Sequence, residues 1–256
     1  MIRSFITAFQ MYSRIPMPRI EWRPENRRYA LCFFPFVGMV MGCLFMLWDR
    51  LCTRLGTGSL LFGAGAVFLT VLVTGGIHLD GFCDTCDARA SWGDKARKLE
   101  ILSDSHIGAF AAIKLGVYLV LYTALLSELQ GTPAAAVTAI GYVLSRALSG
   151  LAAVAFTSAK KEGSLFDFTS NTHKNAALFI LAFTAAASCF AMAAADMPAG
   201  ISAAAAALLL MMYYRHMAYR EFGGITGDLA GWFLQVCELL IAAAAVFTYR
   251  IMEVIA

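Results

Sequence analysis

Residues 60–87 read LLFGAGAVFLTVLVTGGIHLDGFCDTCD, an apolar run of membrane-spanning length that ends in three aspartates. These are Asp80, Asp84 and Asp87. On a helix, spacings of four and then three residues return side chains to the same face. Three like charges on one face repel one another unless a cation binds them, and carboxylate oxygens suit Mg²⁺ or Mn²⁺. The segment is therefore predicted to carry the chemistry of the protein.

The composition predicts an integral membrane protein. Hydrophobic residues make up 60% of the 256 residues and charged residues only 14%, with a mean hydropathy of +0.69. A soluble domain is nearer a quarter charged. We expect one all-α domain over residues 1–256, a polytopic bundle of about seven transmembrane helices. The expected spans are 31–48, 60–77, 109–126, 135–156, 176–195, 199–214 and 231–249. The fifth and sixth are also compatible with one helical hairpin that turns at Asp196, Pro198 and Gly200.

The distribution of Lys and Arg predicts the orientation in the membrane. Most of these residues lie in segments 1–30, 78–108, 157–175 and 215–230. The opposite side carries Arg50, Arg54 and Arg250. We therefore expect the N-terminal segment 1–30 to be cytoplasmic and to begin with a short interfacial helix. The 78–108 connection is expected to be a cytoplasmic catalytic loop, and the C-terminus is expected to lie outside.

Three ionisable residues fall inside predicted spans: Lys114, Arg146 and Glu238. An ionisable group at membrane depth normally faces the bundle interior or a wet cavity and marks function. The alternative is a buried ion pair that fixes packing, between Glu238 and either Arg146 or Lys114. The sequence leaves this choice open.

Another acidic feature stands at the entrance to the third span, where residues 103–110 read SDSHIGAF. Asp104 is a candidate for a fourth metal ligand or for a base that acts on a hydroxyl group. Its alternative role is the N-cap of a helix that begins near Ile107. Cys83 and Cys86 form a CxxC between the aspartates. No second pair or histidine follows at a spacing typical of zinc, so we interpret them as space-fillers.

A glycine-rich segment, FGGITGD at 222–228, lies at the mouth of the last predicted span. Its glycines would let backbone amides approach a phosphate closely, and its threonine adds a hydroxyl donor. The residues concerned are Gly223, Gly224, Thr226, Gly227 and Asp228. Lys160 and Lys161 suit an anionic substrate or simply follow the charge asymmetry. Together with the aspartates, these parts predict metal-assisted phosphoryl transfer, in which cations bridge diphosphate oxygens.

Several of these motifs together resemble the cobalamin (5′-phosphate) synthase family, also named adenosylcobinamide-GDP ribazoletransferase. The matching strings are GGIHLDGFCDTCD (75–87), DSHIGAF (104–110), SR (145–146), EG (162–163), GGITGD (223–228) and PFVGMVMG (35–42). The resemblance runs along almost the whole chain. It implies a Mg²⁺-dependent enzyme of the bacterial inner membrane that transfers cobinamide phosphate from adenosylcobinamide-GDP to α-ribazole or α-ribazole 5′-phosphate and releases GMP.

The resemblance also implies which residues act on the reacting groups. Asp80, Asp84 and Asp87 would hold the metal against the diphosphate, with Asp104 as the candidate fourth ligand. The ribose 3′-hydroxyl of the acceptor would be the nucleophile. Asp104 or His78 would be the base that takes its proton.

Further residues would bind the substrates. Arg146, Lys160 or Lys161 would stabilise phosphate charge, and Asp228 with its glycines would complete the nucleotide pocket. No nucleic acid is expected as a partner. The oligomeric state stays open, a homo-oligomer included.

The sequence departs from the family pattern beside the aspartates. Cys83 and Cys86 stand where small residues such as alanine are more usual, and Ala88 and Arg89 follow Asp87 where glycine is expected. No departure removes a carboxylate, so the expected reaction is unchanged. Arg89 is a candidate partner for Asp87, which would alter the set of metal ligands.

Three other functions fit parts of the pattern less well. A CDP-alcohol phosphotransferase needs DxxDGxxAR and a spaced downstream pair of aspartates, whereas this chain has only DxxDAR. A membrane prenyltransferase usually has a second aspartate-rich loop, and only Asp167 and Asp228 are present in the later half. A transporter would concentrate its charges at mid-bilayer, whereas the acids here cluster at the end of a span.

Overall fold

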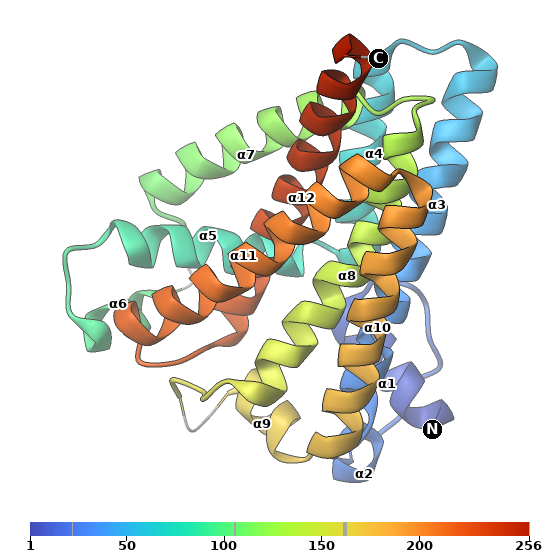
Figure 1. The fold of residues 1–256 in the computed structure, drawn as a ribbon. Coiled ribbons are helices and arrows are strands. Elements are labelled where there is room, and N and C mark those ends of the chain that lie inside the picture. Colours follow the sequence, from blue (N-terminus) through green and yellow to red (C-terminus); the bar gives the residue numbers. More distant parts are fainter. Residues whose placement is uncertain (22, 105, 161–162, 256) are drawn as a thin grey trace.

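The computed structural model describes residues 1–21, 23–104, 106–160 and 163–255, and it shows a bundle of helices (Figure 1). The first elements are α1 (Ile2–Tyr12), α2 (Pro24–Arg27), the 3₁₀-helix η1 (Ala30–Phe33), α3 (Phe34–Leu55), α4 (Ser59–Thr74), α5 (Ile77–Ala90) and α6 (Lys95–Ile101). The later ones are α7 (Ala109–Ser127), α8 (Pro133–Ala155), α9 (Ser164–Ser170), α10 (Lys174–Ala195), α11 (Met197–Glu221) and α12 (Gly227–Ile255). Over the described ranges the only β pairing is an isolated bridge between Ser158 and Ile225. The expected all-α fold is confirmed.

Among the described residues, six helical segments are long and apolar enough to cross a membrane, and the bent pair α4–α5 brings the number to seven if it counts as one span. The predicted polytopic bundle of about seven spans is therefore confirmed. The short span expected at 199–214 is part of the 25-residue helix α11. Asp196 caps this helix by accepting a hydrogen bond from the N–H of Ala199 at 2.9 Å. The turn expected between the fifth and sixth spans is thus present, and it joins two long helices.

The chain bends by 96° between α4 and α5. Gly75 and Gly76 stand at the bend with φ angles of +65° and +79°, a region that side chains with a Cβ atom rarely adopt. After the bend, α5 lies across the direction of α4 (Figure 1). This corrects the expectation that 78–108 is a loop, because α5 and α6 make up most of it. The aspartates spaced by four and three residues therefore do lie on a helix, as their spacing predicts.

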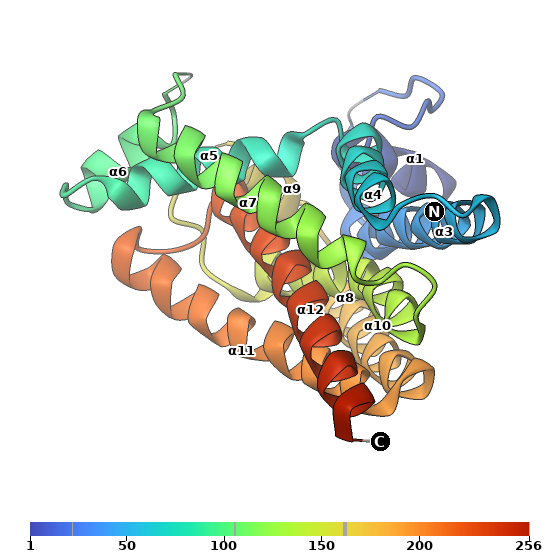
Figure 2. The same cartoon turned by 90° about the horizontal axis from the view of Figure 1, so that it is seen from above.

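Helix α8 occupies the middle of the bundle and packs against α3, α10, α11 and α12 (Figures 1 and 2). Two glycines bring α3 against it. A Cβ atom on Gly38 would lie 2.3 Å from the carbonyl oxygen of Tyr142, and one on Gly42 would lie 2.5 Å from that of Ala139. Small residues at helix contacts allow this close backbone approach, which is how helices associate within a membrane.

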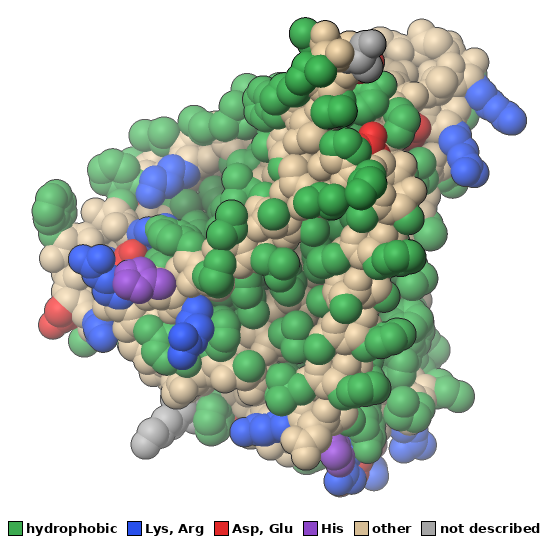
Figure 3. Space-filling model, in the orientation of Figure 1, with side chains coloured by type: hydrophobic (Ala, Val, Ile, Leu, Met, Phe, Trp, Pro, Cys, Tyr) green, Lys and Arg blue, Asp and Glu red, His purple; other side chains and the backbone are tan. Residues whose placement is uncertain are grey.

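The outward-facing side chains are apolar over long stretches. On α10, Phe179, Phe183 and Phe190 are 74%, 68% and 78% exposed. Figure 3 shows apolar side chains across the middle of one face, with Lys and Arg toward its lower and left margins and a smaller group at the upper right. Soluble proteins rarely expose so much contiguous apolar surface. This surface therefore suits contact with lipid.

The N-terminal segment begins with the expected helix, and that helix packs on protein. Helix α1 buries Ala8 and Phe9 and contacts η1 and α3. The Tyr12 ring lies against the Phe34 ring, with a centroid distance of 4.1 Å. Helix α1 therefore packs on the bundle beside η1 and the start of α3.

Candidate active site

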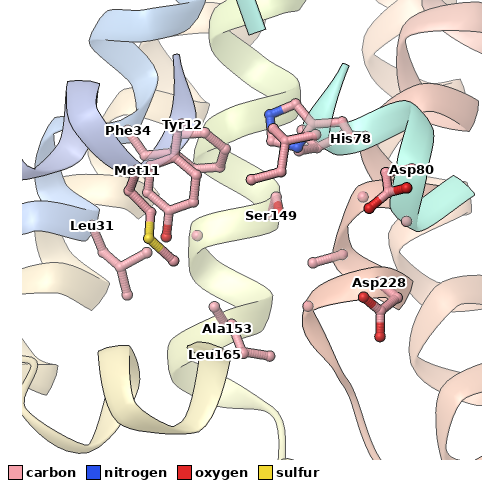
Figure 4. A pocket seen from close by; sticks show the side chains of 17 residues that line it. Met11, Tyr12, Leu31, Phe34, His78, Asp80, Ser149, Ala153, Leu165 and Asp228 are labelled. Atoms are coloured by element: carbon pink, nitrogen blue, oxygen red, sulfur yellow. The ribbon is translucent and has the colours of Figure 1, made fainter. Parts of the chain in front are cut away.

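Two glycines position the candidate site, where α5 crosses the start of α12. A Cβ atom on Gly81 would lie 2.8 Å from the carbonyl oxygen of Asp228, and one on Gly231 would lie 3.0 Å from that of His78. There is no room for a side chain at either position, so the two helices meet backbone to backbone. As a result, Asp80 on α5 and Asp228 on α12 line one pocket (Figure 4).

Asp84 lies one helical turn beyond Asp80 and is influenced by three neighbouring carboxylates. Its pKa is raised to about 7, first by burial and then by the negative charges of Asp80, Asp228 and Asp87. The structure thus brings Asp228 to the acidic face predicted from the sequence. Because like charges at close range disfavour ionisation, this cluster is a place where a cation is stabilising.

Asp87 belongs to the same helical face, but its carboxylate is bonded to the start of α7. It accepts hydrogen bonds from the N–H groups of Gly108 at 2.6 Å and Ala111 at 2.8 Å. A carboxylate at a helix N-terminus is stabilised by the orphan amides and the helix dipole. The candidate partner Arg89 forms its salt bridge with Glu221 instead, at 3.1 Å. Asp87 therefore ties α5 to α7.

Asp104 lies apart from this cluster. Its carboxylate accepts a hydrogen bond from the N–H of His106 at 3.0 Å and lies 2.7 Å from His106 Nδ1. Its side chain is 57% exposed. Helix α7 begins at Ala109 with Gly108 as its N-cap, so the alternative role of Asp104 as that cap is wrong. The α7 amides are bonded by Asp87 instead, a contact that local sequence does not reveal.

The glycine-rich segment packs against residues 157–159. A Cβ atom on Gly224 would lie 2.5 Å from the carbonyl oxygen of Thr157. The N–H of Ile225 donates to that oxygen at 2.9 Å, and the N–H of Gly224 donates to the carbonyl of Ala218 at 3.2 Å. The Gly224 amide is therefore already bonded within the protein, and the predicted contact of this segment with a phosphate stays a prediction. Gly223 has a positive φ of 81° and makes the turn into this contact.

Thr226 and Asp228 begin α12 beside the cluster. The Thr226 hydroxyl accepts a hydrogen bond from the N–H of Leu229 at 3.2 Å, which caps the helix. The positive charge of Lys160 lies close enough to act on Asp228, and Lys160 Nζ donates to Ser103 Oγ at 2.6 Å. Lys160 thus borders the acidic cluster. Lys161 lies outside the described residues, so its predicted role stays a prediction.

The pocket has an acidic end and an apolar end (Figure 4). Asp80 and Asp228, with Gly227, form the acidic end on α5 and α12. The apolar end is lined by side chains from α1, η1, α3, α8 and α9, namely Met11, Tyr12, Leu31, Phe34, Ala153 and Leu165. The space between these walls, including the open mouth of the pocket, is about 740 Å³.

His78 lines the same pocket and is 5% exposed. Among the described residues its Nε2 atom has no hydrogen-bond partner. Burial, together with the positive charge of Arg146, lowers the pKa of His78 to about 3. The imidazole is therefore neutral in the empty pocket, and its free nitrogen is available to a ligand.

The sequence did not reveal that α1 belongs to the site. Phe5, Ile6 and Phe9 give the start of the chain an apolar face, which predicts a short interfacial helix. Such a face packs equally well on lipid and on protein. Only the fold places Met11 and Tyr12 across the pocket from Asp80.

Arg146 is fully enclosed in the bundle core and does not line the pocket. It forms a salt bridge with Glu238, and the two residues are 0% and 3% exposed. Its guanidinium also donates to Ser145 Oγ at 2.9 Å and to the carbonyl oxygen of Tyr142 at 3.3 Å. The ion-pair alternative is thus confirmed for Arg146, and direct contact with substrate is not supported. Lys114, the other candidate partner, donates to the carbonyl oxygen of Cys86 at 3.3 Å.

The acidic cluster does not form a closed cage for a divalent cation. In the part of the chain that the structure describes, no three His, Cys, Asp or Glu side chains are arranged to hold one ion. Mg²⁺ does not require such a cage, because it keeps several waters and usually binds one or two carboxylates plus substrate phosphates. Asp80, Asp84 and Asp228 are hard oxygen donors with unbalanced charge. The residues present therefore fit Mg²⁺ held jointly with a diphosphate.

Comparison with known proteins decides the family. The sequence model described as "Cobalamin-5-phosphate synthase" matches residues 4–246. The chain belongs to this family. A cobalamin-5-phosphate synthase relative from Lachnoclostridium phytofermentans, named adenosylcobinamide-GDP ribazoletransferase, is 41% identical over 96% of this chain and 94% of its own length. No solved structure matches.

More distant relatives carry the same name. One from Clostridium botulinum strain Eklund 17B is 32% identical over 97% of this chain and 99% of its own. One from Treponema denticola is 30% identical over 96% and 98%. Membership of the cobalamin-5-phosphate synthase family makes the protein a membrane-embedded transferase of cobalamin biosynthesis. The resemblance seen in the sequence is confirmed at this level, ahead of the lipid phosphotransferase, prenyltransferase and transporter alternatives.

Proposed function

We propose that the protein transfers the cobinamide-phosphate group of adenosylcobinamide-GDP to α-ribazole or α-ribazole 5′-phosphate, with Mg²⁺ as cofactor. The observation that supports this most is the meeting of Asp80 on α5 with Asp228 on α12 at the end of a pocket, with Asp84 close enough to feel the charge of both. In a family whose relatives are named for this reaction, such a cluster is where a diphosphate would be handled.

The reaction exchanges one phosphorus–oxygen bond for another. The 3′-hydroxyl oxygen of the acceptor ribose attacks the phosphorus that carries the cobinamide. The anhydride bond to GMP breaks, GMP leaves with the bonding electrons, and the hydroxyl loses its proton. Phosphoryl transfer depends mainly on positioning and on charge stabilisation. The protein therefore has to align two substrates and balance their charges.

Asp80, Asp84 and Asp228 would hold Mg²⁺, which when bound neutralises the diphosphate oxygens. Lys160, which acts electrostatically on Asp228, would add positive charge at the rim of this cluster. Asp87 would act indirectly, by fixing α5 to the start of α7.

Of the two bases suggested by the sequence, His78 has better support than Asp104. His78 lines the pocket with Nε2 free, whereas Asp104 is exposed and bonded to His106. Neutral imidazole can accept the hydrogen bond of the ribose hydroxyl. A diphosphate bound nearby would raise the pKa of His78 from its low value and so favour proton uptake.

A direct assay tests the reaction. Purified protein in detergent would be incubated with adenosylcobinamide-GDP, α-ribazole 5′-phosphate and Mg²⁺, and GMP would be measured over time. We expect GMP only when donor and acceptor are both present, loss of release in EDTA, and recovery on adding Mg²⁺. GMP formation without acceptor, or full activity in EDTA, would contradict the proposal.

We also propose that the protein lies in a bacterial inner membrane, with the acidic cluster on the cytoplasmic side. Arg50 and Arg54 at the end of α3 and Arg250 near the end of α12 are the few cations on the opposite side. Reporters fused after α12 and inserted after Asp94 should give extracytoplasmic and cytoplasmic signals respectively. The reverse pattern would refute this orientation.

A further inference from the structure

We propose that the apolar end of the pocket binds the flat base of the acceptor nucleoside, so that α1 helps to determine which base the enzyme accepts. This rests on the proposed function, because it assigns one end of the pocket to one substrate of that reaction. The occupant is a benzimidazole riboside, and the competing occupant is the guanine of the donor.

An aromatic pair forms the wall of this end. The rings of Tyr12 and Phe34 lie 4.1 Å apart between centroids and are tilted by 32°. Met11, Leu31 and Leu165 complete the wall (Figure 4). Aromatic faces favour offset or tilted contact with another ring, and such contacts contribute beyond the area they bury. A flat aromatic base therefore suits this wall.

The few polar groups near this wall favour benzimidazole over guanine. Guanine carries several donors and acceptors on its edge, and each must be hydrogen-bonded when it is buried. The polar side chains that line the pocket away from its acidic end are Tyr12, Ser149 and His78. Dimethylbenzimidazole carries two methyl groups and, once joined to ribose, a single acceptor nitrogen. Burying dimethylbenzimidazole at this wall therefore costs little free energy, whereas buried guanine would have polar atoms without hydrogen-bond partners.

The length of the pocket then determines where the sugar lies. With its base between α1 and α8, an acceptor would direct its ribose toward Asp80 and Asp228 (Figure 4). His78 lies between the two ends, where its free Nε2 atom would meet a ribose hydroxyl. The same placement leaves the diphosphate and cobinamide at the acidic mouth. Base recognition and phosphoryl transfer thus occupy opposite ends of one cavity.

Two variants test this assignment. Phe34→Leu removes the ring from the wall, and Met11→Ala shortens a half-buried side chain at its edge. We expect the KM for α-ribazole 5′-phosphate to rise about tenfold, as for the loss of a good apolar contact, and the KM for adenosylcobinamide-GDP to stay within about twofold. Phe183→Leu on the outward face of α10 is the matched control and should change neither.

Binding of α-ribazole alone provides a readout that does not need turnover. Titration followed by benzimidazole fluorescence should give a weaker Kd in Phe34→Leu and Met11→Ala than in the wild type and the control. Unchanged binding in both variants would overturn the assignment. A rise in the KM for the donor, in place of the KM for the acceptor, would also overturn it and would place the guanine of the donor at this end. Wild-type protein that binds α-ribazole through this wall but releases no GMP would reject the proposed reaction and keep the base site.

Discussion

Two groups of charges lie inside the bundle, and they differ in what balances them. Arg146 and Glu238 are enclosed in the core and neutralise each other. Asp80 and Asp228 line a pocket, Asp84 lies one helical turn beyond Asp80, and all three are acidic. Both groups looked alike in the sequence, as acids and bases within or beside apolar runs. The comparison shows that buried charges which balance each other are structural, whereas like charges grouped together are suited to binding a ligand. Charge balance distinguishes the two kinds of group better than depth in the membrane does.

The largest effect is expected where the unbalanced group is altered. Asp84→Asn should reduce GMP release by about 10²–10³-fold, because a carboxylate that would hold Mg²⁺ against the diphosphate is lost. Its thermal stability in detergent should not fall, since the change removes a repulsion. Glu100→Gln, at a 68% exposed side chain in α6, is the matched control and should keep full activity. Near wild-type turnover in Asp84→Asn would remove the cluster from the mechanism.

A substitution in the balanced pair, Arg146 and Glu238, should instead lower the stability of the fold. Arg146→Met leaves Glu238 buried and unpaired, and breaking such a pair costs about 3–5 kcal/mol of folding free energy. Arg146→Met combined with Glu238→Leu should recover much of this loss. Arg250→Met, at a solvent-exposed ion pair, should cost far less stability. Unfolding midpoints in a denaturant series would measure all three, and equal losses at Arg146 and Arg250 would refute the distinction.

The crossing that creates the acidic cluster can be disturbed without touching a carboxylate. Gly81→Ala would press a Cβ atom against the backbone of Asp228, and such overpacking costs about 1–3 kcal/mol. We expect turnover to fall about tenfold, in proportion to the displacement of α5 from α12. Gly116→Ala on α7, where nothing lies within 4 Å, should be silent. Equal activities of the two variants would show that the crossing tolerates a side chain.

The smallest expected effect is a pH dependence of stability. Asp84 has a pKa of about 7 in the folded protein, above its value of about 4 in the unfolded chain. The folded state therefore binds more protons between these values, and stability in EDTA should fall as the pH rises from about 4 to about 7. Melting curves of wild type and Asp84→Asn would compare the slopes, which should be shallower in the variant. Mg²⁺ should flatten the wild-type slope, and identical slopes in all samples would contradict this account.

The spans and the acidic helix face could be predicted, because both depend on residues close together in the chain. Hydropathy located the spans, and the spacing of Asp80, Asp84 and Asp87 indicated one helical face. Helix α11 exceeds its predicted span because its backbone continues past Arg215 and Arg220, which end the apolar run but not the helix. Local pattern is sufficient for features of this kind.

The remaining features depend on contacts between distant residues. The sequence predicts a loop at 78–108, because a glycine pair such as Gly75 and Gly76 is compatible with a loop as well as with a bend between helices. The contact of Gly81 with Asp228 joins segments far apart in the sequence, as does the bond from Asp87 to α7. The glycines at 223 and 224 suggest a phosphate loop, yet Gly224 serves close packing against Thr157 and Gly223 makes the turn before it. Residue type alone does not distinguish these uses.

The pocket wall draws Tyr12 from the beginning of the sequence and Asp228 from the last helix, α12. During biosynthesis the early helices enter the membrane long before α12 emerges from the ribosome. Until then Asp80 and Asp84 have neither their neighbour on α12 nor a closed cavity. A half-made chain therefore cannot bind diphosphate prematurely, and catalytic competence arrives in one step with the insertion of the final helix.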